Sequence, residues 1–192
     1  MDICQKHPGG AEVELSMLFV DVRGSTSIAE GMGAAEFSRL MNRFYAAVTK
    51  SLIRSDAFID KLVGDEVIGL YLPIFAGKEH ARKAVEAAQD VLRATGHGSA
   101  HGPWLAVGVG VHTGPAFFGT VSGAEGSVTD FTALGDSMNT AARLVAEAAA
   151  GEALISDAAY AAAGVDLGPL ERRSLQVKGK TERVDAWALR IE

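Results

Sequence analysis

Residues 60–66 (DKLVGDE) lie between two short apolar runs, residues 57–59 (AFI) and residues 67–72 (VIGLYL). Apolar runs of this length predict strands, and the Gly-Asp pair between them predicts a tight hairpin. This hairpin would present a carboxylate, Asp65, at its tip and an amine, Lys61, on its incoming strand. An acid and a base at the mouth of a sheet suit metal and phosphate chemistry. A solvated turn explains the same residues, and the hairpin alone favours that simpler interpretation.

The segments around the hairpin alternate between strand and helix patterns. Residues 15–22 (LSMLFVDV) are almost continuously apolar, which is typical of a strand buried on both faces. Ser25 or Thr26 could cap the helix that follows. Helical spacing of apolar residues predicts long helices over 34–53 and 80–95. Further strands are predicted over 104–112, 117–121, 128–134, 153–155, 171–177 and 184–189, with helices over 137–150 and 157–163. This order mixes hairpins with crossovers, which predicts an α+β fold with helices on a largely antiparallel sheet.

Length and composition limit the classes of protein to consider. The 192 residues suffice for one domain with a substantial core. A formal net charge of −6 disfavours a nucleic-acid partner, and the single cysteine, Cys4, excludes a disulfide framework or a cysteine-based zinc site. No apolar run approaches the roughly 20 residues that span a bilayer, so we expect a soluble, cytoplasmic module without membrane contact. Residues 1–14 are polar and predict a linker or N-terminal extension, which leaves room for an upstream sensor domain.

Two carboxylates are candidates for a metal site. Asp21 ends the first predicted strand, and Asp65 lies at the hairpin tip. If these strands are neighbours, both carboxylates reach one edge of the sheet, where two oxygen donors with open positions suit Mg²⁺. Arg23 is the only cation close to Asp21 in the sequence, and an unpaired carboxylate after a buried run is costly. The alternative is that each aspartate is an ordinary strand-end or turn residue.

Two further groups suit phosphate chemistry. Asn139 and Arg143 are four residues apart on a predicted helix and therefore share a face. An amide and a guanidinium together can stabilise charge on phosphate oxygens, although such a pair is usually just a solvated face. Lys178 lies in a tight turn that suits a polyphosphate, but lysine-rich surface turns are common. Residues 108–110 (GVG) begin like a dinucleotide fingerprint, but the position of its third glycine holds Thr113.

Five separated segments together resemble the catalytic domain of the class III nucleotide cyclases. They are FVDVRGST (19–26), KLVGDEV (61–67), VGVHTG (109–114), FTALGDSMNTAARL (131–144) and VKGK (177–180). The resemblance implies a ferredoxin-like βαββαβ core, with a central, mostly antiparallel sheet flanked by helices. It also implies that residues 15–192 form a catalytic domain, which converts ATP to 3′,5′-cyclic AMP and pyrophosphate.

The resemblance also implies a cofactor and a metal site. The metal-binding aspartates of the family fall on Asp21 and Asp65, which would hold two Mg²⁺ or Mn²⁺ ions with help from the Val22 carbonyl. The ions would lower the pKa of the ribose 3′-hydroxyl and hold the triphosphate.

The remaining site positions of the family also match residues of this chain. Its catalytic asparagine and arginine fall on Asn139 and Arg143, and its triphosphate-binding lysine falls on Lys178. Lys61 matches the lysine that reads adenine, and the second base-reading position falls on Thr132. Family members form head-to-tail dimers with shared active sites, so the resemblance implies a homodimer. These five residues would then face the two aspartates of the partner.

Two positions depart from the commonest pattern of the family. Thr132 stands where many adenylate cyclases have aspartate, and a branch that includes bicarbonate-responsive enzymes has threonine there. The hydroxyl can still accept a hydrogen bond from the adenine amino group. Gly108 stands where some members have an arginine that contacts phosphate.

Three other functions are alternatives to adenylate cyclase. A guanylate cyclase would share every motif except the base-reading residues. A catalytically silent regulatory module would usually lack an aspartate, the asparagine or the arginine, all of which are present. A diguanylate cyclase carries a Gly-Gly-Asp-Glu-Phe hairpin, whereas residues 63–67 are VGDEV and leave Asn139, Arg143 and Lys178 unexplained.

Overall fold

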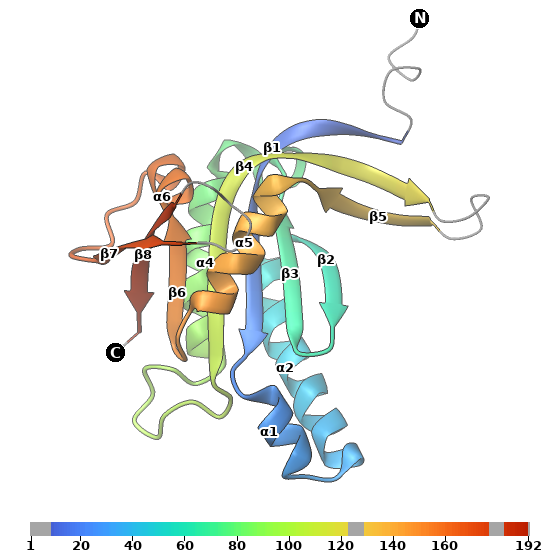
Figure 1. Ribbon diagram of the computed structural model, residues 1–192, viewed down its shortest axis with the longest axis vertical. Helices are drawn as coiled ribbons and strands as arrows, with labels where there is room; N and C mark the ends of the chain where they lie inside the picture. The colour runs from blue at the N-terminus through green and yellow to red at the C-terminus, as the bar shows by residue number, and fades with distance from the viewer. Residues whose placement is uncertain (1–8, 123–128, 177–182, 192) are drawn as a thin grey trace, which may run out of the picture.

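A computed structural model describes residues 9–122, 129–176 and 183–191 of the chain (Figure 1). Within these residues the elements follow in this order: β1 (Gly10–Val22), α1 (Ser25–Glu30), α2 (Ala34–Arg54), β2 (Phe58–Val63), β3 (Glu66–Tyr71), α3 (Pro73–Ala76), the 3₁₀ helix η1 (Gly77–Glu79), α4 (His80–Ala94), β4 (Val107–Ser122), β5 (Thr129–Leu134), α5 (Asp136–Glu147), β6 (Glu152–Ser156), α6 (Asp157–Ala163), β7 (Glu171–Leu175) and β8 (Val184–Arg190).

One mixed sheet organises the domain. Its strand order is β2-β3-β1-β4-β6-β8-β7, and β5 pairs with the outer part of β4. Each neighbouring pair among the first four strands of this order is antiparallel, in the ferredoxin-like arrangement, whereas β6 joins β4 in parallel. The predicted α+β class and the mostly antiparallel sheet are therefore confirmed.

Helices cover both faces of this sheet. Figure 1 shows α2 and α4 behind the central strands and α5 in front of them. Side chains of β1 alternate accordingly: Leu18 and Val20 pack in the core with α2 and α4, while Met17 and Phe19 pack in the core with α5. Asp21 continues the second set, so its side chain lies on the face that α5 covers.

Two strands are longer than the sequence predicts. β1 begins at Gly10, ahead of the predicted start at residue 15, and β4 is one strand where two were expected. The Gly114-Pro115 pair weakens the strand pattern there. It lies inside β4 because β1 pairs with β4 along its whole length, from Gly10 to Val22.

The described helices include none that is both long and apolar enough to cross a bilayer.

Candidate active site

The two predicted metal ligands lie together at one end of the central strands. Asp21 stands opposite Glu66 in the β1–β3 register, next to the hairpin tip. The backbone N–H of Val22 donates to the Asp65 carbonyl at 3.1 Å, which ties the end of β1 to that tip. Strand pairing therefore brings both aspartates to the same edge.

Neighbouring side chains hold both carboxylates. Arg23 Nη2 forms an ion pair with Asp21 Oδ1 at 2.9 Å, so the cation that lies close to Asp21 in the sequence is its partner in the structure. The Ser25 hydroxyl donates to Asp65 Oδ2 and does not cap α1, whose N-cap is Gly24 without a side-chain cap. The prediction of a cap at Ser25 was wrong because Asp65, which is distant in sequence, offers a charged acceptor. Each of these contacts uses one oxygen of the carboxylate.

The electrostatics of this edge favour a bound cation. Burial raises the pKa of Asp21, Arg23 opposes that rise, and the negative charge of Asp65 adds to it. Burial also raises the pKa of Glu66, and the charges of Asp21 and Asp65 raise it further. A divalent cation held by the two aspartates would reduce this repulsion between negative charges.

The donor set fits Mg²⁺ or Mn²⁺. No group of three or more His, Cys, Asp or Glu side chains in the described residues is arranged to hold a metal ion by itself. Two aspartates and a backbone carbonyl suit Mg²⁺, which keeps several waters and takes further ligands from phosphate. An open pocket of about 400 Å³ borders Asp65. Its lining residues are Ser25, Thr26, Ala29, Phe37, Gly64 and Asp65.

The two predicted base-reading residues lie where β2 meets β5. Lys61 forms an ion pair with Asp130, and Thr132 Oγ1 donates to Asp60 Oδ2 at 3.1 Å. Lys61 and Thr132 are thus linked through adjacent partners, although they are 71 positions apart in the numbering (132 minus 61). Burial raises the pKa of Asp60, while the hydrogen bond from Thr132 and the charge of Lys61 oppose that rise.

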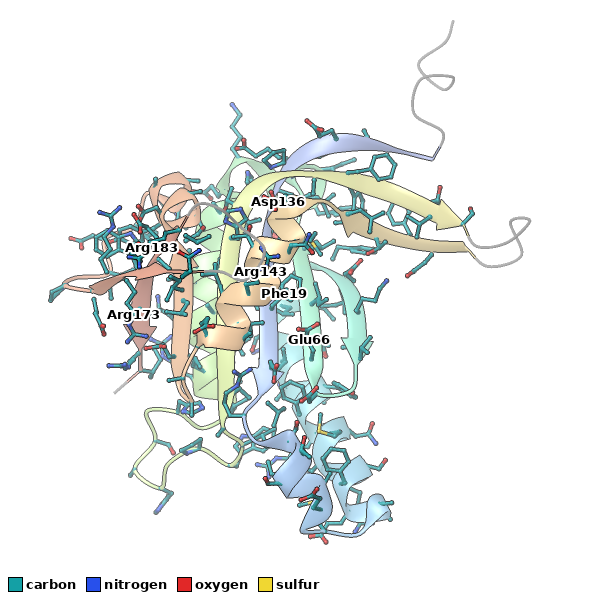
Figure 2. All side chains as sticks on the ribbon, viewed as in Figure 1. Phe19, Glu66, Asp136, Arg143, Arg173 and Arg183 are labelled. Carbon is teal, nitrogen blue, oxygen red and sulfur yellow. The ribbon has the colours of Figure 1, made fainter. Side chains whose placement is uncertain are left out.

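Helix α5 carries the predicted catalytic pair. The Asn139 side chain is exposed and Arg143 is half-buried. Arg143 Nη1 is buried and has no hydrogen-bond partner among the described residues. Figure 2 shows the Arg143 side chain on α5, in front of the sheet, and Glu66 on β3. Burying a guanidinium nitrogen without a hydrogen-bond partner costs free energy, and a bound anion would provide that partner.

Close packing positions α5. A Cβ atom on Gly110 of β4 would lie 2.5 Å from the backbone nitrogen of Val145 and 2.7 Å from the carbonyl oxygen of Ala141. Only glycine permits this approach, which explains the residue without a dinucleotide site. Arg23 Nη1 also donates to the Val145 and Ala148 carbonyls, each at 3.2 Å, and so links Asp21 to α5.

The structure also explains the departure at Gly108. A Cβ atom there would lie 3.3 Å from the guanidinium carbon of Arg23 and 3.1 Å from the Cβ of Ala148. Arg23 therefore occupies the space beside residue 108, and a long side chain at that position does not fit without a rearrangement.

Some site residues were missed by the sequence analysis. Asp60 and Asp130 were not singled out, nor was Tyr45, whose hydroxyl donates to the Gly64 carbonyl at the hairpin tip. Their partners are distant in sequence, so no local pattern marks them. Lys178 lies outside the described residues.

Known proteins with similar sequences and structures include nucleotide cyclases. The family described as adenylate and guanylate cyclase catalytic domain matches residues 10–190. An adenylate cyclase of Anabaena cylindrica is 33% identical over 134 residues, which cover 68% of this chain and 26% of that protein. A terminal-differentiation specific adenylate cyclase of Dictyostelium discoideum is 31% identical over 181 residues, or 90% of this chain and 8% of that protein. The chain thus spans about a quarter or less of these two relatives.

Two solved structures share the fold. The adenylyl cyclase CyaB from P. aeruginosa superposes with a TM-score of 0.81 at 26% identity, covering 95% of this chain and 97% of that chain. The guanylyl cyclase Cya2 superposes with a TM-score of 0.82 at 24% identity, covering 94% and 93%. Because the family match covers residues 10–190, the chain belongs to the family of adenylate and guanylate cyclase catalytic domains.

Proposed function

We propose that this chain is an adenylate cyclase that converts ATP to 3′,5′-cyclic AMP and pyrophosphate at the interface of a homodimer. The observation that carries the choice of ATP is the junction of β2 and β5. There, Lys61 and Thr132, which match the base-reading positions of the family, are linked through Asp130 and Asp60. A lysine ammonium donates to adenine N1, and a hydroxyl oxygen accepts from the adenine amino group.

In the reaction, the ribose 3′-oxygen attacks the α-phosphorus of ATP. The bond from that phosphorus to the bridging oxygen breaks, pyrophosphate leaves, and the 3′-hydroxyl proton is released. Asp21 and Asp65, with the Val22 carbonyl, would hold two Mg²⁺ or Mn²⁺ ions. When bound, the ions would lower the pKa of the 3′-hydroxyl and neutralise phosphate charge. Asn139 and Arg143 would stabilise the charge that develops on the substrate in the transition state.

The way in which one hairpin distributes its residues supports the proposed dimer. Asp65 contacts Ser25 and β1, whereas Lys61 contacts β5. In a head-to-tail homodimer, Asp21 and Asp65 of one subunit would face Lys61, Thr132, Asn139, Arg143 and Lys178 of the other. One hairpin would then serve two active sites, and each subunit would contribute to both.

Purified protein incubated with Mn²⁺ and either ATP or GTP tests the substrate. Cyclic AMP is expected as the main product, with a rate that is second order in protein at low concentration. Cyclic GMP as the main product would establish the guanylate cyclase alternative. If no product forms at concentrations where the protein is dimeric, the catalytically silent regulatory module is the remaining alternative. Lys61→Glu is expected to damage ATP use more than it creates GTP use, because Thr132 remains.

Mixing two inactive variants tests the shared site. Asp65→Ala and Lys61→Ala are each expected to be inactive alone. A mixed dimer has one site that carries both substitutions and one that carries neither, so part of the activity should return. No recovery from subunits that demonstrably exchange would contradict the shared geometry.

A further inference from the structure

A β-bulge in β2 directs the side chains of two adjacent residues toward the same neighbouring strand. The β2–β3 register shifts between Ile59 and Lys61, with Asp60 as the extra residue. In a regular strand, neighbours face opposite sides of the sheet, and a bulge re-aims a side chain. Here Asp60 reaches Thr132 and Lys61 reaches Asp130, two residues spaced to share one face of β5.

The contact between Asp60 and Thr132 fixes the direction of a single proton. Thr132 Oγ1 is the donor and Asp60 Oδ2 the acceptor, at 3.1 Å, and Thr132 is buried. A hydroxyl has one proton and two lone pairs, and an ionised carboxylate can only accept. While Thr132 donates to Asp60, it can offer only lone pairs to a third group.

The surroundings keep this geometry in place. Phe58 on β2 and Phe131 on β5 pack edge to face, with ring centroids 6.0 Å apart. Phe118 on β4 packs against both rings, at 5.6 Å and 4.5 Å. Asp60 Oδ1 is buried and has no hydrogen-bond partner among the described residues. Burying this oxygen without a partner costs free energy, which indicates that Asp60 does more than fill space.

Adenine and guanine carry groups of opposite hydrogen-bonding character at C6 of the purine ring. Adenine carries an amino group at C6, which donates, whereas guanine carries a carbonyl oxygen there, which only accepts. A hydroxyl that is free to rotate serves either base, but a hydroxyl whose proton is already committed serves adenine alone.

We propose that Asp60 is a specificity-determining positioning residue, which commits the Thr132 proton and so makes Thr132 an acceptor that selects adenine over guanine. This inference rests on the proposed function, since it concerns the base that the same site binds. Asp60 acts through Thr132 and does not need to touch the substrate. In this chain it would provide the negative charge that an aspartate at position 132 would otherwise bring.

Asp60→Asn tests the proposal with little change of shape. The asparagine amide can donate to Thr132 Oγ1, which frees the hydroxyl proton to point at guanine O6. The ratio of kcat/KM for ATP to kcat/KM for GTP is expected to fall about 10-fold, the effect of roughly one hydrogen bond. Asp90→Asn removes the same charge from an exposed position on α4 and should leave the ratio unchanged.

A second background separates this role from a structural one. Thr132→Val removes the hydroxyl and is itself expected to lower the ratio. Asp60→Asn added to Thr132→Val should produce no further change, because nothing remains for Asp60 to orient. An unchanged ratio in Asp60→Asn, or an equal further drop in the Thr132→Val background, would overturn the proposal. Equal losses with ATP and GTP would mean that Asp60 only supports the fold.

Direct binding keeps this test separate from the proposed function. Displacement of a fluorescent ATP analogue by ATP or GTP gives the same preference without turnover. A wild-type protein that forms no cyclic nucleotide would refute the cyclase proposal, while the binding ratios of wild type and Asp60→Asn would still decide the role of Asp60. A wild type that binds GTP more tightly than ATP would refute both.

Discussion

Gly110→Ala tests how the packing of α5 on β4 supports the active site. The added Cβ would lie 2.5 Å from the backbone nitrogen of Val145, whereas ordinary contacts begin near 3.4 Å. The helix must therefore shift by about 0.9 Å, the difference between these distances, because the obstructing atoms are backbone. That helix carries Asn139 and Arg143, so the strain at Gly110 reaches the proposed catalytic pair.

Both stability and activity should respond. Overpacking a well-filled core costs about 1–3 kcal/mol of unfolding free energy. For a chain of this size, 1 kcal/mol shifts Tm by roughly 2–4 °C, which predicts a Tm lower by about 2–12 °C. A misplacement of about 1 Å in a catalytic group can cost around 100-fold in rate, so kcat should fall by about that factor.

Gly33→Ala is the matched control. Gly33 has a φ of −70° and no atom within 4 Å of an added Cβ, so the same methyl group meets open space. Because Gly33 is the N-cap of α2, where alanine is less favourable than glycine, its effect on stability should be about 1 kcal/mol or less, and kcat should not change. Thermal unfolding by circular dichroism, at one fixed protein concentration, and cyclic nucleotide formation would be measured for both variants. Equal Tm and equal kcat for Gly110→Ala and Gly33→Ala would refute the packing argument.

Three further perturbations probe the site, the core and the pH response. Arg143→Ala should lower kcat by about 100-fold or more. Its Tm should be almost unchanged, since the described residues include no hydrogen-bond partner for the buried Nη1 of Arg143. An unchanged kcat in a product assay would contradict the catalytic role of Arg143. Glu152 is buried and forms ion pairs with Arg173 at 3.0 Å and Arg190 at 2.9 Å. Glu152→Gln should therefore lower the free energy of unfolding, measured in urea, by about 1.5–3 kcal/mol. An unaltered urea midpoint would contradict this stabilising role of Glu152. Burial lowers the pKa of His97, whose Nε2 accepts from the Val107 N–H at 3.3 Å. Around pH 6.5 and just below it, the unfolded chain therefore binds more protons than the folded chain, so the free energy of unfolding should fall as the pH is lowered from 7 to 5.5. This fall should be larger in the wild type than in His97→Gln. Equal falls in the two proteins would exclude His97 as the cause.

Local patterns were sufficient to predict much of the fold. Helical spacing placed α2 and α4 to within a residue of their observed ends, and the Gly-Asp turn placed Asp65 at a hairpin tip. These predictions succeed because periodicity and turn chemistry act between residues a few positions apart. The long pairing of β1 with β4 was not predictable in this way, since Gly114 and Pro115 weaken the local signal.

The sequence by itself determined the family and the candidate residues, since five separated segments and their order are properties of the chain. Only the tertiary structure showed which partners these residues have. The bond from Thr132 to Asp60 spans 72 residues, and that from Arg23 to Val145 spans 122. A bulge in β2 and a glycine under α5 decide these contacts, and neither leaves a periodic signature. Hydrogen bonds and close packing depend on distances of a few tenths of an ångström between remote segments, which only the folded sheet sets.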